Sequence, residues 1–155
     1  MSEPIYILGA ARTPIGSFQG ALAKQSAPVL GAHAIKGALA NAGVDAEEVN
    51  EVIMGNVVSA GLKQAPARQA MRMADMPDAV GATTLNKVCG SGMKATMMAM
   101  DLIAAGSADT VIAGGMESMS NAPYLLLKAR GGLRMGHANM QDSLFTDGLE
   151  DAETG

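Results

Sequence analysis

Charged and aromatic residues are both scarce in this chain of 155 residues. Charged side chains account for 17% of it, against about 25% in an average soluble domain, and tryptophan is absent. The 11 basic and 15 acidic side chains leave a net charge of −4 and a pI near 5.0, which argues against a nucleic-acid-binding domain with a basic face. A hydrophobic fraction of 48% at such low net charge also excludes a disordered chain.

Cysteine and long apolar runs are scarce as well. The one cysteine, Cys89, cannot form a disulfide within the chain, so a disulfide-stapled secreted domain is not expected. The nearest approach to a membrane span, residues 97–105, is interrupted by Asp101 and is too short to cross a bilayer. No basic region precedes an apolar run at the N-terminus, so we expect no signal peptide. These absences predict a cytoplasmic protein with no membrane or nucleic-acid partner.

Glycine and methionine, by contrast, are plentiful, at 19 and 13 residues. A chain of this length buries enough surface to form one hydrophobic core without the help of disulfides or metal ions. Its scarce charge leaves little polar surface for a free-standing monomer, so we expect it to bury further surface against other subunits or further polypeptide.

Apolar β-branched runs alternate with segments that have helical spacing. This alternation predicts an α/β fold with a largely parallel sheet. Proline at the start and glycine after the end delimit the first helix, which we expect from Pro28 to a left-handed cap at Gly43. The other expected helices are one from Pro66 to near Asp75 and a long one at 90–105; the expected strands lie at 4–10 (buried, ending at Gly9), 49–58, 82–88 and 110–113.

The chain is less regular outside these elements. Asp45 and Glu48 have capping-box spacing and predict one short helical turn. Residues 116–140 contain several glycines and only a weak helical pattern at 124–129. Long irregular stretches of this kind are often functional.

The most informative segment surrounds Cys89, where a strand ends, the chain turns and a helix begins. A cysteine at a helix N-terminus is favoured as thiolate by the helix dipole. Free backbone amides at the same place can stabilise an oxyanion. The segment therefore predicts a cysteine nucleophile suited to acyl transfer. Because the helix at 90–105 is apolar on nearly all sides, we expect it to be buried with Cys89 at the bottom of a pocket.

Other interpretations of these residues remain open. A lone cysteine is more often an inert, buried apolar side chain. Residues 90–95 also fit the dinucleotide-binding pattern G-x-G-x-x-A, but they follow the third expected strand rather than the first. A cysteine nucleophile needs a base, and the two histidines are weak candidates: His33 is expected to pack or face solvent, and His137 to be a polar loop residue.

Several motifs resemble those of the thiolase family, the acetyl-CoA acetyltransferases, in the same order along the chain. The segment around Cys89, NKVCGSG at 86–92, resembles the motif of the family's acyl-enzyme cysteine. The others are ARTPIG at 11–16, GNV at 55–57, PARQA at 66–70, AGGMESMS at 113–120 and DGL at 147–149.

This resemblance implies a fold and a chemistry. The fold is a thiolase-like N-terminal half with layered helices, a mostly parallel mixed sheet and a buried helix that starts at the cysteine. Residues 1–120 would form the N-terminal α/β domain, and residues 121–155 the beginning of a loop domain that covers coenzyme A. Cys89 would carry the acyl group and donate its amide to an oxyanion, and Leu149 would line the substrate channel. Residues 61–68 would lie near a subunit interface.

The resemblance also implies partners and missing parts. Acetyl-CoA would be the substrate in fatty acid metabolism, without a metal or tightly bound cofactor, and the full-length enzymes form homodimers or homotetramers. The family's base histidine, in a Gly-His-Pro motif, and its second cysteine would follow residue 155, so the 155 residues alone are expected to be inactive. Two alternatives are a non-catalytic assembly module with an inert Cys89 and a ketoacyl-synthase-like condensing enzyme, although the flanking motifs do not resemble the latter.

Overall fold

A computed structural model describes residues 4–155, and its centre is a three-stranded parallel sheet. The strands are β1 (Glu51–Gly55), β2 (Gly81–Leu85) and β3 (Val111–Gly115), in the order β2-β1-β3. Ile53 of β1 is level with Thr83 of β2 and Ala113 of β3. The α/β class and the parallel sheet predicted from the sequence are thus confirmed.

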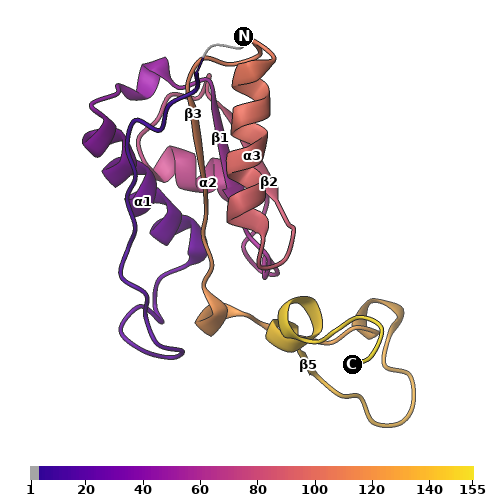
Figure 1. The fold of residues 1–155 in the computed structure, drawn as a ribbon. Coiled ribbons are helices and arrows are strands. Elements are labelled where there is room, and N and C mark those ends of the chain that lie inside the picture. Colours follow the sequence, from indigo (N-terminus) through magenta and orange to yellow (C-terminus); the bar gives the residue numbers. More distant parts are fainter. Residues whose placement is uncertain (1–3) are drawn as a thin grey trace.

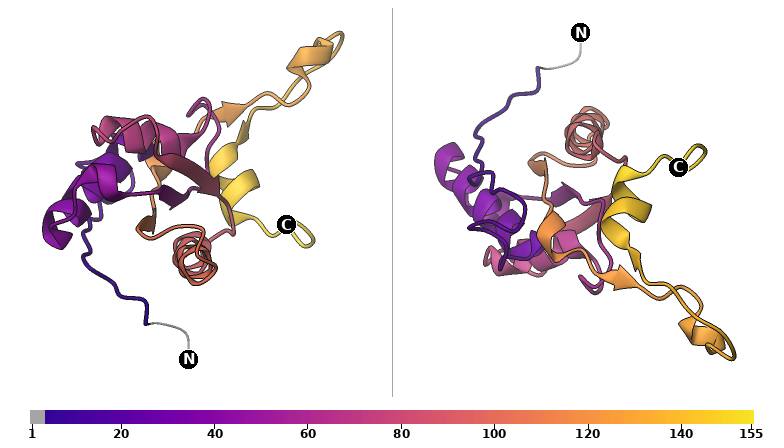
Figure 2. Two further views of the ribbon diagram at one scale, coloured as in Figure 1. Left: turned by 90° about the horizontal axis from the view of Figure 1, so that it is seen from above. Right: turned by 90° about the horizontal axis from the view of Figure 1, so that it is seen from below.

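Helices cover both faces of this sheet. The helices α1 (Ala27–Ala42) and α2 (Pro66–Met73) pack together on one face, and α3 (Ser91–Ala104) lies on the other (Figures 1 and 2). The main apolar core lies between β1 and the α1–α2 pair, where Ile35, Val52 and Met71 are almost completely buried. Within residues 4–155, no helix is both long and apolar enough to cross a membrane.

The ends of α1 agree with the sequence signals. Pro28 lies in its first turn, and Gly43 follows it with a φ of 64°, a left-handed conformation that costs glycine little. The short turn expected after it is a 3₁₀ helix (Ala46–Glu48), and the Asp45 amide donates to Glu48 Oε2 over 3.1 Å. Both predictions are confirmed.

Residues 122–155 leave the sheet region and pair with one another. The short strands β4 (Tyr124–Leu125) and β5 (Gln141–Asp142) are antiparallel, and a π-helical turn (Phe145–Leu149) follows them (Figure 1). The predicted helical patch at 124–129 is therefore wrong. Its first residues, Tyr124 and Leu125, pair instead with Asp142 and Gln141, which are too distant in the sequence to affect a local helical pattern.

The buried strand predicted at 4–10 is also wrong. The segment is irregular, and Ile7 is 86% exposed. A strand needs a neighbour to satisfy its backbone, and no strand in the described part of the chain pairs with this segment. Instead, its end lies against α1, where Asn41 Nδ2 donates to the Ala10 carbonyl over 2.8 Å.

The third prediction to be corrected concerns α3, which is only half-buried. Ala95 and Ala99 face the sheet and are buried, whereas Met93 and Met97 on the other side are 73% and 50% exposed. The small side chains let α3 approach the sheet closely. Nothing in the described part of the chain covers the methionine side.

Candidate functional site

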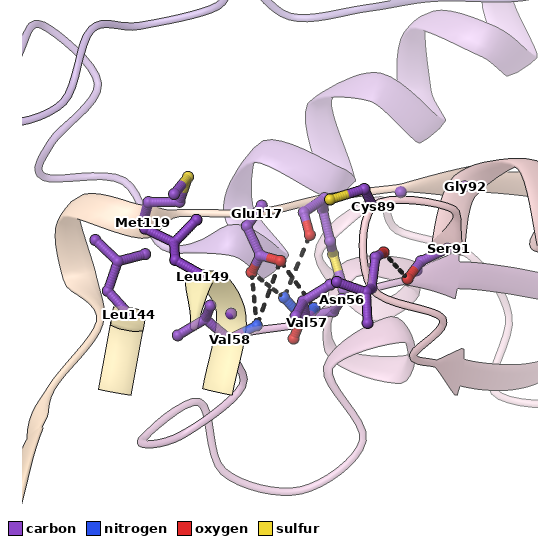
Figure 3. A pocket seen from close by; sticks show the side chains of 15 residues that line it. Asn56, Val57, Val58, Cys89, Ser91, Gly92, Glu117, Met119, Leu144 and Leu149 are labelled. Carbon is purple, nitrogen blue, oxygen red and sulfur yellow. Dashed lines mark hydrogen bonds between the residues drawn. The ribbon is translucent and has the colours of Figure 1, made fainter. Parts of the chain in front are cut away.

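Three segments that leave the carboxyl ends of the parallel strands converge on one cavity. Asn56 follows β1, Cys89 lies in the turn after β2, and Glu117 follows β3 (Figure 3). The crevice at the carboxyl ends of parallel strands is where α/β proteins commonly bind ligands. The cavity has a volume of about 400 Å³ and is mainly lined by apolar groups.

Cys89 is held in a tight turn that is strained at the preceding residue. Val88 has a φ of 46°, a left-handed conformation that is costly for a β-branched side chain. The Val88 amide donates a hydrogen bond to Asn86 Oδ1 over 2.8 Å. Strain of this kind persists only where the surroundings enforce it.

Ser91 ties this turn to the start of α3. Its hydroxyl accepts a hydrogen bond from the Lys87 amide over 2.9 Å and donates one to the Val88 carbonyl over 2.6 Å. The Gly90 and Ser91 amides donate hydrogen bonds to the Lys87 and Val88 carbonyls of the same turn. The Cys89 amide, in contrast, donates to no protein oxygen among residues 4–155.

Glycines seat the first turn of α3 against the sheet. A Cβ on Gly55 of β1 would lie 2.5 Å from Ser91 Cβ and 2.9 Å from the Ser91 carbonyl carbon. Gly92 lies close to β3, since a Cβ there would be 3.8 Å from Gly114 C and Gly115 N. These glycines permit the approach that places the Cys89 turn at the cavity.

The exposure of Cys89 differs from the expectation. Cys89 lines the cavity but is exposed, so the predicted position at the bottom of a pocket is wrong. Cys89 belongs to the turn before α3 rather than to the helix face that packs on the sheet, and its neighbours Val88 and Met93 are exposed as well.

Glu117 and Asn56 form a network that the sequence analysis missed. The Glu117 carboxylate accepts hydrogen bonds from Asn56 Nδ2 at 2.7 Å and from the Val57 amide at 2.8 Å, and both oxygens lie 3.3 Å from the Val58 amide. Asn56 Nδ2 also donates to the Met116 carbonyl over 3.2 Å. We call the group Asn56, Val57, Val58 and Glu117 the clamp. The sequence signals were Asn56, directly after the apolar residues of β1, and Glu117, two residues after β3, each in one of the motifs quoted above.

Burial affects the charge state of the clamp. It raises the pKa of Glu117 above the ordinary glutamate value, against the opposing effect of the hydrogen bonds from the Val57, Val58 and Ser118 amides and from Asn56. The Oδ1 atom of Asn56 is buried without a hydrogen-bond partner in the described structure. The hydrogen bonds that orient the Asn56 side chain therefore all come from Nδ2.

The π-helical turn and the residue before it add two leucine side chains to the apolar lining of the cavity. Leu144 and Leu149 both line it, and Leu149 is 56% exposed (Figure 3). A Cβ on Gly148 would lie 3.2 Å from Val58 Cγ2, so this turn packs directly on the clamp. Leu149 thus lies in the same cavity as Cys89, and its contact with a substrate stays a prediction.

The two histidines lie elsewhere. His33 is exposed on α1 and borders a separate hollow with Arg12, and His137 is exposed in the loop between β4 and β5. Neither lines the cavity of Cys89. Residues 4–155 contain no group of three or more His, Cys, Asp or Glu side chains arranged to hold a metal ion.

Comparisons with known proteins extend over the whole described chain. Residues 5–155 match a family described as "Thiolase, N-terminal domain". Acetyl-CoA acetyltransferases of Cupriavidus necator and Schizosaccharomyces pombe are 54% and 51% identical to the chain over 95% and 100% of its length. A cytosolic acetyl-CoA acetyltransferase of Gibberella zeae is 50% identical over 96% of it. The chain spans only 37–39% of the length of these relatives.

Proposed function

Because the chain belongs to the thiolase family, through the N-terminal domain of that family, we propose that it supplies the acyl-accepting cysteine of an acyl-CoA C-acyltransferase. The observation that carries the proposal is the placement of Cys89. It lies in a strained, hydrogen-bonded turn before α3, at the edge of the cavity, with its own amide unengaged. That arrangement offers a nucleophile and an oxyanion donor from one residue.

The proposed reaction begins with attack of Cys89 Sγ on the carbonyl carbon of an acyl-CoA thioester. A new sulfur–carbon bond forms, the bond to the coenzyme A sulfur breaks, and the cysteine proton leaves with coenzyme A as its free thiol. The negative charge on the carbonyl oxygen is stabilised by the Cys89 amide. The named activity of the relatives leads us to propose acetyl-CoA as the donor, with condensation of two acetyl-CoA molecules to acetoacetyl-CoA, or the reverse thiolysis, as the overall reaction.

The surroundings of the site belong to the same proposal. Leu149 would contact the acyl or pantetheine portion of the substrate, since it lines the cavity. A domain boundary near residue 120 is consistent with β4 and β5 pairing only with each other. Assembly into dimers or tetramers and a cytosolic location are proposed as well, the latter because one relative is named as cytosolic.

A second candidate function is an assembly module in which Cys89 is inert. The exposed methionine side of α3 favours it, because contiguous apolar surface marks interaction sites. The two functions differ in what they predict for the thiol. Only the acyltransferase requires that Cys89 accept an acyl group.

The decisive experiment is acetylation of the 155-residue chain by acetyl-CoA, followed by intact mass and peptide mapping. We expect one acetyl group on Cys89, released by hydroxylamine, and none in the matched variant Cys89→Ser. Steady cleavage of acetoacetyl-CoA is not expected, since a positioned base contributes about 10²–10⁴-fold and no histidine lines the cavity. An unacetylated Cys89 that also alkylates slowly would favour the inert module.

A further inference from the structure

We propose that Glu117 is a positioning residue that fixes the wall formed by Val57 and Val58 in the cavity of Cys89, through the hydrogen bonds of the clamp. The role in catalysis rests on the proposed acyl transfer at Cys89, whereas the clamp itself can be tested without it. Glu117 lines the cavity and, in the described structure, forms no hydrogen bond with the turn that carries Cys89.

The geometry joins two strand ends that are distant in sequence. Glu117, after β3, accepts hydrogen bonds from a side-chain amide and two backbone amides that directly follow β1. Hydrogen bonds to a charged acceptor are about twice as strong as neutral ones. One carboxylate therefore determines the path of the backbone through residues 56–58.

That path determines the shape of the cavity. Val58 is buried and lies 3.2 Å from the position that a Gly148 Cβ would take. The turn that carries Leu149 consequently packs against the Val58 side chain, and the Val58 amide is held by Glu117. A displacement of Val58 changes the space available to an acyl group beside Cys89.

The Cys89 turn has separate supports. Its hydrogen bonds come from Asn86 and Ser91, neither of which contacts Glu117 through a hydrogen bond in the described structure. Loss of the clamp should therefore alter the fit of an acyl substrate while leaving the access of a small reagent to the thiol unchanged. A merely structural residue would affect both.

The first test measures amide hydrogen exchange at Val57 and Val58 in the 155-residue chain. Glu117→Gln keeps the shape of the side chain but removes its charge, so exchange at both amides is expected to accelerate about tenfold. The matched control is Glu47→Gln, an exposed glutamate outside the cavity. Equal exchange in wild type and Glu117→Gln would overturn the proposal.

The second test separates binding of the acyl donor from reactivity of the thiol. In Glu117→Gln, the acetyl-CoA concentration for half-maximal acetylation of Cys89 is expected to rise about tenfold, with an unchanged rate of alkylation by iodoacetamide. A slower alkylation by iodoacetamide, or an unchanged acetyl-CoA concentration for half-maximal acetylation, would overturn the positioning role.

Two further outcomes have a defined meaning. If wild type accepts no acetyl group, the proposed function fails, and the exchange result alone decides whether Glu117 fixes the wall. If Glu117→Gln does not fold, Glu117→Asp replaces it. That variant keeps the charge but retracts the carboxylate by one methylene group, and the same directions are expected.

Discussion

Two opposing influences act on the ionisation of Glu117. Removal from water disfavours the carboxylate, while donors from Val57, Val58 and Asn56 favour it. Desolvation is the larger effect, so the pKa is raised. Ionised Glu117 accepts the hydrogen bonds of the clamp, yet burial makes its ionisation less favourable in the folded chain than in water.

This competition predicts a pH dependence of stability with a definite sign. Between the ordinary glutamate pKa, about 4.3, and the raised pKa of Glu117, the folded chain binds more protons than the unfolded chain. The contribution of Glu117 to the free energy of unfolding therefore falls as the pH rises through this window. Urea unfolding of wild type and Glu117→Gln at a series of pH values measures it. We expect wild type to lose stability relative to the variant with rising pH, and a relative gain would show that the hydrogen bonds outweigh burial.

At the level of elements, the contact between α3 and the sheet depends on glycine. Gly55 meets Ser91 at a distance that leaves no room for a methyl group. The sheet and the helix start therefore form one rigid unit beneath the Cys89 turn. A change at Gly55 should reach Cys89 through Ser91.

Gly55→Ala is accordingly expected to lower the free energy of unfolding by about 3 kcal/mol, because overpacking against backbone atoms forces the helix to shift. Urea denaturation measures the loss. Gly131→Ala is the matched control, since no atom lies within 4 Å of the position that a Cβ would take there and its φ is not positive; a change below about 1 kcal/mol is expected. Equal losses of stability in the two variants would contradict close packing of α3 against Gly55.

The sequence correctly predicted those features that depend only on residues close together in the chain. The cap at Gly43, the proline start of α2 and the helix after Cys89 all depend on neighbouring residues, and they were correct. The segment at 4–10 failed because its apolar pattern says nothing about whether a strand lies beside it. Pairing partners are a property of the assembled sheet.

The site shows the same division. Cys89 could be found because its turn and glycines are contiguous in sequence. Asn56 and Glu117 lie in quoted motifs, but their contact could not be predicted, since it depends on β1 and β3 being neighbours. The order of strands in a parallel sheet is not written in any single segment.

For the whole molecule, the main consequence of the scarce charge is an uncovered apolar surface. Met93, Met97 and Met100 follow one another at helical spacing along the outer side of α3 and are all at least 50% exposed. Contiguous apolar surface of this kind favours association. The shortage of polar surface expected from the composition is located on the outer side of α3.

We therefore expect the 155-residue chain to self-associate with increasing concentration, and the double change Met97→Gln and Met100→Gln to weaken that association. Multi-angle light scattering measures both. Met135→Gln is the control, because Met135 is 97% exposed but lies in the loop between β4 and β5. A chain that stays monomeric at every concentration would contradict this role for α3.

The clamp has a consequence for the order of events during synthesis. Val57 emerges from the ribosome 60 residues before the glutamate that accepts its hydrogen bond, a delay of roughly 3–12 s at ordinary elongation rates. During that interval β2 and Cys89 are translated, but the amides of Val57 and Val58 still lack the carboxylate that accepts their hydrogen bonds. The nascent chain thus contains Cys89 before it contains the glutamate that holds the cavity wall, and translation of the segment after β3 supplies that glutamate.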